Sequence, residues 1–250
     1  MRAIVIIFIC LVLAPTVGAQ TADSTLSDII DKVDKLYRSE SSHGTMEMEI
    51  VTQHWQRTLT MEVWTSGLEK TLVRIHEPKK EEGVGTLRLE DQMWNYLPKT
   101  NKVIKIPPSM MMSSWMGSDF TNDDLVKEFS LFEDYTSSWA DVKDPSDTLY
   151  YIQLTPRPDL PIVWGKIIIT ARQSDYLPVT QEYYDEKGRL MRVMTYSDIQ
   201  MMDDRRIPTT MTMVPQDEEG NKTILRYEQI EFNVDLPGDL FSLRNLRSYP

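Results

Sequence analysis

Alternation of apolar and polar residues with a period of two runs through most of this chain and restricts it to a β-sheet protein. Apolar side chains take every second position in three runs, which are Met46, Met48 and Ile50, then Leu59, Met61 and Val63, then Met211 and Met213. Successive side chains of a strand point to opposite sides, so this pattern is typical of antiparallel strands with one apolar face. We expect these methionine-rich positions to line one concave face.

The strands expected from alternation and turn residues follow one another closely. After the first two runs they lie at 69–76, 84–90, 92–97, 101–106, 131–138, 148–155, 164–172, 177–184, 189–199, 205–214 and 222–232. This short spacing indicates hairpins in a continuous meander and gives no room for the helical crossovers of a parallel sheet. A single sheet of this length must curl to cover its apolar face. The sequence therefore predicts a mainly β (α+β) fold: one curled antiparallel sheet that forms an open barrel around an apolar cavity.

Two helices are expected beside the strands. Residues 23–38 carry an apolar stripe with helical spacing, with Ser24 as the candidate cap; the stripe consists of Leu26, Ile29, Ile30, Val33, Leu36 and Tyr37. Thr121 to Asp124 has the pattern of a capping box for a short helix that ends near Phe129.

The first residues have the features of a cleaved export signal. Met1-Arg2 is a short basic start, residues 3–14 are an apolar run, and Val17-Gly18-Ala19 supplies the small residues of a cleavage site. We expect residues 1–19 to be a signal peptide and residues 20–250 to form one domain. The only cysteine, Cys10, lies inside the signal, so the mature chain has no disulfide. This combination favours a bacterial periplasm.

Charge and motifs argue against several classes of function. The formal net charge of −11 gives no general attraction for nucleic acid. His43, His54 and His76 lack the close spacing of a zinc site, and the Asp119–Asp124 segment fails the EF-hand pattern. No G-x-S-x-G motif or Gly-rich phosphate loop is present. We therefore expect no catalytic residues, no metal and no cofactor.

A methionine-rich stretch interrupts the strands at residues 107–120. It begins with two prolines and contains four methionines, a tryptophan and a phenylalanine, but one charge. The simplest interpretation is one side of a core helix. The alternative is a mobile lid, because methionine side chains adapt to ligands of variable shape. On this interpretation the candidate ligand-binding residues are Met110, Met111, Met112, Trp115, Met116 and Phe120 in the lid, with Met46, Met48, Met61, Met211 and Met213 on the sheet.

Arg74 is a further candidate whose role depends on the register of its strand. If Val73 and Ile75 point inward, Arg74 is a solvated charge. In the opposite register Arg74 points into the cavity, where it could anchor a lid carbonyl or a lipid head group.

Several segments, taken in order, resemble the outer-membrane lipoprotein-sorting family of LolA-like periplasmic carriers. They are Ser42-His43-Gly44-Thr45-Met46, Trp94-Asn95-Tyr96-Leu97-Pro98, Ile106-Pro107-Pro108, Trp115-Met116-Gly117-Ser118-Asp119-Phe120 and Asp123-Asp124-Leu125, and the similarity continues to Leu240-Phe241. The resemblance implies an incomplete antiparallel barrel of about eleven strands, of the LolA/LolB type, with a helical lid over a cavity for acyl chains. It also implies a link to lipid-exporting membrane permeases.

Two functional hypotheses remain. The first is a soluble periplasmic carrier that takes the acyl chains of a lipid or lipoprotein toward the outer membrane, with an inner-membrane exporter or an outer-membrane acceptor as partner. The second is a lipid sensor of the RseB kind, or a periplasmic accessory subunit of a lipid-exporting permease. A carrier should release its cargo, whereas a sensor should stay bound to one membrane protein with or without cargo.

Overall fold

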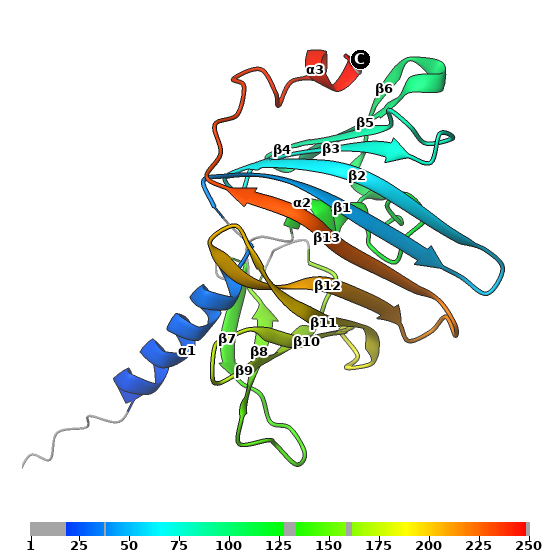
Figure 1. The fold of residues 1–250 in the computed structure, drawn as a ribbon. Coiled ribbons are helices and arrows are strands. Elements are labelled where there is room, and N and C mark those ends of the chain that lie inside the picture. Colours follow the sequence, from blue (N-terminus) through cyan, green and yellow to red (C-terminus); the bar gives the residue numbers. More distant parts are fainter. Residues whose placement is uncertain (1–18, 38, 128–133, 159–161, 249–250) are drawn as a thin grey trace, which may run out of the picture.

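The computed structural model describes residues 19–37, 39–127, 134–158 and 162–248 (Figure 1). The expected signal peptide lies outside these residues except for Ala19, where helix α1 (Ala19–Asp34) begins. Phe129, the expected end of the second helix, also lies outside them. Among the described helices, none has both the length and the apolar composition needed to cross a bilayer.

One antiparallel sheet contains the thirteen strands of the described residues. The first half of the chain supplies β1 (Ser41–Val51), β2 (Gln56–Ser66), β3 (Lys70–Glu77), β4 (Gly85–Leu89), β5 (Gln92–Leu97) and β6 (Lys102–Lys105). The second half supplies β7 (Tyr135–Trp139), β8 (Leu149–Pro156), β9 (Lys166–Arg172), β10 (Pro178–Tyr184), β11 (Leu190–Met202), β12 (Arg205–Pro215) and β13 (Lys222–Phe232).

The sheet consists of two meanders joined by one long-range strand pair. Its order is β6-β5-β4-β3-β2-β1-β13-β12-β11-β10-β9-β8-β7, so β1 and β13 pair at the centre while β6 and β7 are the two edges. The sheet curls strongly, and the two meanders face each other across its concave side (Figure 1). Fold class and curled architecture agree with the sequence prediction. The sheet has thirteen strands, two more than the resemblance implied, and each range predicted from alternation overlaps one of them.

The connection between β6 and β7 has to cross from one edge of the sheet to the other. It contains the 3₁₀ turn η2 (Pro108–Met110) and the helix α2 (Asn122–Lys127). A shorter 3₁₀ turn, η1 (Pro98–Thr100), lies before it, between β5 and β6. In Figure 1 α2 lies on the concave side of the sheet. We call residues 107–127 the lid, because they extend over the concave face.

The strand registers explain why the methionines are buried together. Met46 pairs with Met61 on one side and with Tyr227 on the other, and Met48 pairs with Leu59. Along β1 every second residue is buried, as expected for a strand with one face on a core. This confirms the predicted apolar face. Met48 is fully buried, whereas Met46 and Met61 are buried residues that border a cavity, described below.

Helix α1 packs its predicted apolar stripe against the second meander. Leu26, Ile29 and Ile30 are buried in a core with residues of β8 to β12. The Lys32 ammonium lies 3.7 Å from the centre of the Tyr176 ring. The predicted boundaries were wrong at both ends. Helix α1 begins at Ala19, so Ser24 is inside the helix and is not its cap, and it ends at Asp34, before Leu36 and Tyr37 of the predicted stripe.

The C-terminal segment covers part of the outer, convex face. Its helix α3 (Leu243–Arg247) begins after Ser242, whose hydroxyl accepts a hydrogen bond from the Asn245 backbone N–H at 3.1 Å. Leu246 is fully buried and packs with Leu72, Leu87 and Tyr96 in a second, smaller core. The convex face of β3 to β5 is therefore not a solvated surface.

Candidate functional site

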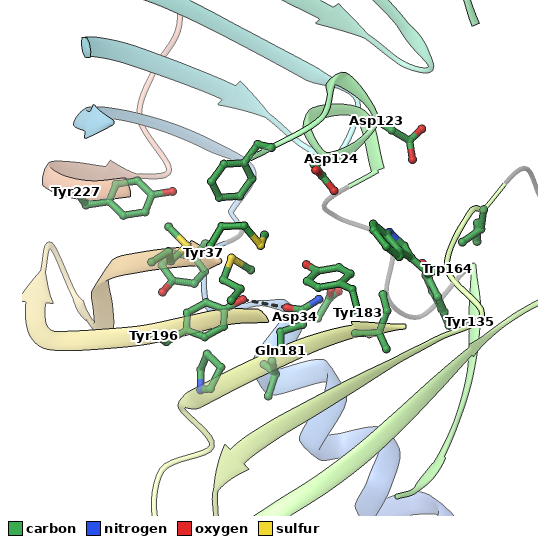
Figure 2. Close-up of a pocket in the computed structure, with 18 residues that line it drawn as sticks. Asp34, Tyr37, Asp123, Asp124, Tyr135, Trp164, Gln181, Tyr183, Tyr196 and Tyr227 are labelled. Carbon is green, nitrogen blue, oxygen red and sulfur yellow. Dashed lines mark hydrogen bonds between the residues drawn. The ribbon is translucent and has the colours of Figure 1, made fainter. Parts of the chain in front are cut away.

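Two neighbouring cavities lie on the concave side of the sheet. The first has a volume of about 140 Å³, and we call it the tyrosine chamber (Figure 2). Its aromatic lining residues are Tyr37, Phe120, Tyr135, Trp164, Tyr183, Tyr196 and Tyr227. The second has a volume of about 110 Å³, and we call it the methionine chamber. Its lining includes Met46, Met61, Val63, Val73, Trp115, Leu125 and Ile230.

The two chambers share a wall. Tyr37, Phe120, Met211 and Tyr227 line both of them. The rings of Tyr37 and Tyr227 stack with centroids 5.8 Å apart, and the Tyr37 hydroxyl donates a hydrogen bond to the Pro208 carbonyl at 2.7 Å. Phe120 is the one lid residue in this wall. The wall between the chambers is therefore formed by the sheet, by Tyr37 after α1, and by the lid.

Two contacts attach the lid to the first meander. The Trp115 indole N–H donates to the Thr86 hydroxyl on β4 at 3.1 Å, and Trp115 is 4% exposed. Arg57 on β2 donates to the backbone carbonyl of Met116. Met116 and Gly117 have φ values of 54° and 76°, so this tight turn uses the left-handed conformation at two successive residues. Glycine tolerates that conformation best.

Asp119 attaches the lid to β13. Its carboxylate accepts a hydrogen bond from the Thr223 hydroxyl at 2.7 Å, while its own backbone N–H donates to the same hydroxyl at 2.9 Å. Burial raises the pKa of the Asp119 carboxyl above its ordinary value, and the hydrogen bond from Thr223 offsets only part of this effect.

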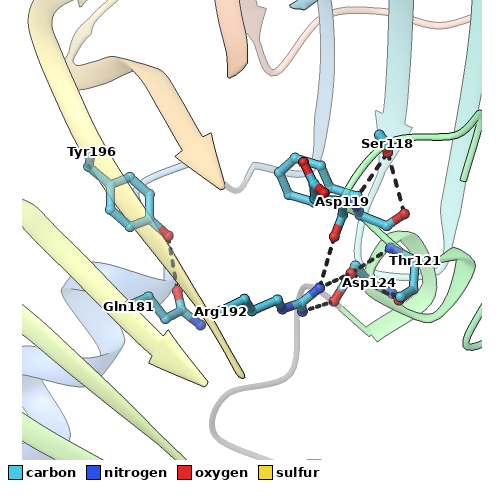
Figure 3. A network of polar contacts seen from close by, with 8 residues as sticks. Ser118, Asp119, Thr121, Asp124, Gln181, Arg192 and Tyr196 are labelled. Atoms are coloured by element: carbon cyan, nitrogen blue, oxygen red, sulfur yellow. Dashed lines mark hydrogen bonds and ion pairs between the residues drawn. The ribbon is translucent and has the colours of Figure 1, made fainter. Parts of the chain in front are cut away.

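A buried ion pair attaches the lid to β11 (Figure 3). The Arg192 guanidinium donates to both carboxylate oxygens of Asp124, at 2.7 and 2.5 Å, and to the Asp119 carbonyl at 3.3 Å. Arg192 also lies over the rings of Trp164 and Tyr183, 4.5 and 4.2 Å from their centroids. Burial by itself would lower the pKa of Arg192, but the adjacent Asp124 carboxylate outweighs it and the pKa is raised. Arg192 is therefore a permanent cation here.

The predicted capping box at the start of α2 is confirmed. The Thr121 hydroxyl accepts from the Asp124 backbone N–H at 3.1 Å, and the Asp124 carboxylate accepts from the Thr121 backbone N–H at 2.7 Å. The same carboxylate thus caps the helix and binds Arg192.

The predicted ligand-binding residues fall into three groups. Trp115, Phe120, Met46, Met61, Met211 and Met213 line a chamber. Met48, Met111 and Met116 pack in the core beside the methionine chamber without lining it. Met110 and Met112 are 47% and 41% exposed. For these last two the predicted contact with the cavity is wrong, because they lie in the turn where the lid faces solvent.

The position of Arg74 fits neither predicted alternative, a solvated charge or a side chain that points into the cavity. Val73 lines the methionine chamber, so Arg74 points to the opposite face, yet it is only 5% exposed. Its guanidinium donates to the Leu246 and Asn245 carbonyls of α3, at 2.9 and 3.1 Å. Arg74 therefore holds the C-terminal helix and does not reach the chambers.

Apart from Phe120, Met211 and Met213, the lining of the tyrosine chamber was not predicted from the sequence. The chamber is lined by Gln181, Tyr183 and Tyr196 from β10 and β11 and by carboxylates of Asp34, Asp123 and Asp124. Gln181 and Tyr183 stand two residues apart in a predicted strand, which placed them on one face. Nothing in the local sequence connects them with Tyr37 or Arg192.

The histidines contribute no site in the chambers. His43 and His76 both contact the Glu62 carboxylate on the convex face, at 2.5 and 3.0 Å. Within the described part of the chain, no three His, Cys, Asp or Glu side chains are arranged to hold a metal ion.

An open cleft beside α1 adjoins the methionine chamber. It has a volume of about 700 Å³ and shares Ser39 and Gly67 with that chamber. Its other lining includes side chains of both charges, such as Asp31, Lys35 and Arg205.

The fold of this curled antiparallel sheet is similar to that of LolA-like proteins of known structure. A DUF1329 family protein from Desulfovibrio piger is similar with a TM-score of 0.79 and 21% identity, over 89% of this chain and 98% of that one. A domain assigned to outer membrane lipoprotein-sorting proteins, from Vibrio parahaemolyticus, has a TM-score of 0.76 and 22% identity, over 91% and 100% of the two chains. A LolA superfamily protein from Nitrosomonas europaea has a TM-score of 0.74 and 22% identity, over 88% and 98%. The predicted LolA-like fold is confirmed.

The family assignment is separate from this likeness of fold. A family model with the description "Uncharacterized protein" matches residues 67–248, which is more than half of the chain, and the chain belongs to this family. No curated protein sequence matches this chain.

Proposed function

We propose that this protein binds the acyl chain of a lipid or lipoprotein in its two chambers and carries it across the periplasm toward the outer membrane. The observation that supports this proposal is the pair of adjoining cavities under the lid, one of them lined mostly by apolar side chains and, among its described lining residues, by no charged one. Methionine supplies Met46, Met61, Met211 and Met213 of the lining, and its flexible side chain adapts to chains of different shape.

Burial of the chain supplies the binding free energy in this proposal. Each acyl methylene removed from water contributes about 0.8 kcal/mol. Affinity should therefore rise with chain length until the chambers are full. A cavity of about 150 Å³ is known to hold one benzene molecule, so chambers of about 140 and 110 Å³ take only part of a long chain in the closed form. A longer chain requires the lid to move outward or the chain to leave through the cleft beside α1.

The decisive experiment is native mass spectrometry of protein purified from its own periplasm, followed by lipid extraction. We expect a co-purified acyl lipid. Met61→Trp, which fills the methionine chamber, should lose the lipid, whereas Met112→Trp, a matched change at an exposed lid position, should keep it. The proposal fails if the wild-type protein carries no lipid or if both variants carry the same amount.

Transfer separates a carrier from a sensor. Lipid-loaded protein should pass its cargo to acceptor vesicles and then be recovered free. A stable complex with one membrane protein, formed equally with and without cargo, would instead support the sensor or accessory-subunit hypothesis.

Export is tested independently of binding. N-terminal sequencing of the protein from the periplasm should begin at Gln20 if the signal is cleaved after Ala19. A product that keeps Cys10 and stays membrane-bound would contradict the soluble-carrier proposal.

A further inference from the structure

Polar groups are distributed unequally between the two chambers. Carboxylates and an amide line the tyrosine chamber, namely Asp34, Asp123, Asp124 and Gln181. Among its described lining residues, the methionine chamber has hydroxyl groups but no charged or amide side chain. A ligand that occupies both chambers would therefore have one polar and one apolar end.

Gln181 identifies the kind of polar group that fits. It is 8% exposed, and its Oε1 accepts a hydrogen bond from the Tyr196 hydroxyl at 3.0 Å (Figures 2 and 3). Its Nε2 makes no hydrogen bond within the described residues, and the side chain lines the chamber. A side-chain amide that lines a cavity can donate to a polar group placed in that cavity. The ligand should therefore place a hydrogen-bond acceptor against Nε2.

The carboxylates in the lining favour a ligand that can donate as well. Asp124 already accepts two hydrogen bonds from Arg192 and two from Thr121, which match the roughly four lone-pair positions of a carboxylate. A hydroxyl group of the ligand would therefore donate to Asp34 or Asp123, whose side chains also line the chamber. Burial raises the pKa of the Tyr135 hydroxyl, and the charges of Asp134, Asp123 and Asp124 raise it further. The charges of these carboxylates, opposed in part by Arg192, make the surroundings of this ring less favourable for an anionic group.

We infer that the tyrosine chamber binds the uncharged, hydroxyl-bearing head of an amphiphile, such as a glycerol or a single sugar ring, whose chain passes Phe120 into the methionine chamber. This inference rests on the proposed function. A hydroxyl group meets both requirements, because it donates to a carboxylate and accepts from the Gln181 amide. The chamber volume of about 140 Å³ suits one six-membered ring, by comparison with the cavity that holds benzene. The aromatic side chains offer flat faces to such a ring.

The test compares three probes with the same ten-carbon chain and different heads: decyl glucoside, decanoate and decyltrimethylammonium. Each is titrated below its micelle concentration by isothermal calorimetry. We expect decyl glucoside to bind at least tenfold more tightly than the other two. Equal affinities, or tighter binding of decanoate or of decyltrimethylammonium, would overturn the inference.

Variants locate the head group. Gln181→Leu and Gln181→Glu both remove the amide donors, and each should reduce decyl glucoside affinity about tenfold. Decanoate affinity should stay nearly unchanged in Gln181→Leu and should not improve in either variant. Lys35→Met, in the open cleft beside α1, is the control and should change neither affinity. If Lys35→Met alone alters the preference among heads, the head lies in the cleft and the inference is wrong.

Failure of this inference can be told apart from failure of the proposed function. Thermal unfolding and far-UV circular dichroism first establish that each variant is folded. If all three probes bind without preference, the acyl-chain proposal stands and the head-group site is rejected. If no probe binds the folded wild-type protein, both are rejected.

Discussion

At the scale of single residues, Arg192 forms a buried ion pair between the sheet and the lid. Its side chain is 6% exposed, and it joins β11 to the lid through both oxygens of Asp124. Removing one partner of a buried ion pair leaves the other charge uncompensated, at a cost of roughly 3–5 kcal/mol. We therefore expect Arg192→Met to lower the free energy of unfolding by about this amount, measured by urea denaturation.

The control for this prediction is a surface pair on the same sheet. Arg189 bonds Asp185 in the turn between β10 and β11 but is 68% exposed, and such solvated pairs contribute little to stability. Arg189→Met should therefore have little effect. The double variant Arg192→Met with Asp124→Asn should recover part of the loss, because no buried charge remains unpaired. Equal losses for Arg189→Met and Arg192→Met would contradict the assigned role of the buried pair.

Asp119 should make the lid contact with β13 sensitive to pH. Its folded-state pKa is raised, first by burial, above the ordinary value of 3.8. The native state therefore binds the proton more tightly than the unfolded chain does, so this group's contribution to stability is fully present below about pH 3.8 and is lost as the pH rises through the raised pKa.

Asp119→Asn removes this titration and keeps an oxygen that can accept from Thr223. The variant should become more stable relative to wild type as the pH rises from 3.8 to neutral, so the difference in free energy of unfolding, variant minus wild type, should increase. Urea denaturation at a series of pH values measures this difference. A difference that is constant with pH, or that falls as the pH rises, would show that the Asp119 pKa is not raised.

At the scale of elements, neighbouring positions on β1 and β2 differ in whether they pack or line a cavity. Met48 is fully buried without bordering a chamber, whereas Met61 lines the methionine chamber. Met48→Ala should cost about 2–5 kcal/mol, as for a packed core residue. Met61→Ala should cost less, because its side chain already has empty space on one side and has fewer packing contacts to lose.

Urea denaturation of both variants measures the two costs, and binding of an acyl probe to Met61→Ala gives a second readout. The larger methionine chamber in that variant should accept a longer chain than the wild-type chamber does. A full core cost at both positions would mean that the methionine chamber is closed in solution, and the proposed function would lose its main support.

At the scale of the whole molecule, the β1–β13 pair joins the two meanders. Gly44 pairs with Ile230 there, and a Cβ at residue 44 would lie 2.6 Å from the Gln229 carbonyl oxygen. Because that oxygen belongs to the backbone, Gly44→Ala should force β1 and β13 apart. We expect both meanders to lose stability together, seen as coincident shifts of the far-UV circular dichroism and tryptophan fluorescence transitions to lower urea concentration.

Gly238→Ala is the matched control, because a Cβ at residue 238 would meet nothing within 4 Å. That variant should unfold at the same urea concentration as the wild-type protein. If Gly44→Ala also unfolds like the wild type, or if only one of the two spectroscopic transitions moves, the β1–β13 pair does not couple the two meanders.

The sequence by itself determined the strands, their buried faces and the cap of α2. These features depend on neighbours within a few residues: alternation decides which face of β1 and β2 is apolar, and Thr121 and Asp124 stand three positions apart. The lid was also predictable as a segment, although Met110 and Met112 turned out to face solvent. Local pattern shows that a residue is apolar, but not which side of a loop it occupies.

The site was decided by tertiary structure. Pairing of β1 with β13 brings Met46 beside Tyr227, and the curl of the sheet brings Arg192 to Asp124 across 68 residues. Arg74 shows the same limit, because its alternation suggested a solvated side until α3 covered it. Such contacts depend on which strands form the edges and how far the sheet curls, and both follow from packing of the whole chain. For that reason the methionine chamber could be anticipated from one strand pattern, whereas the tyrosine chamber required the fold.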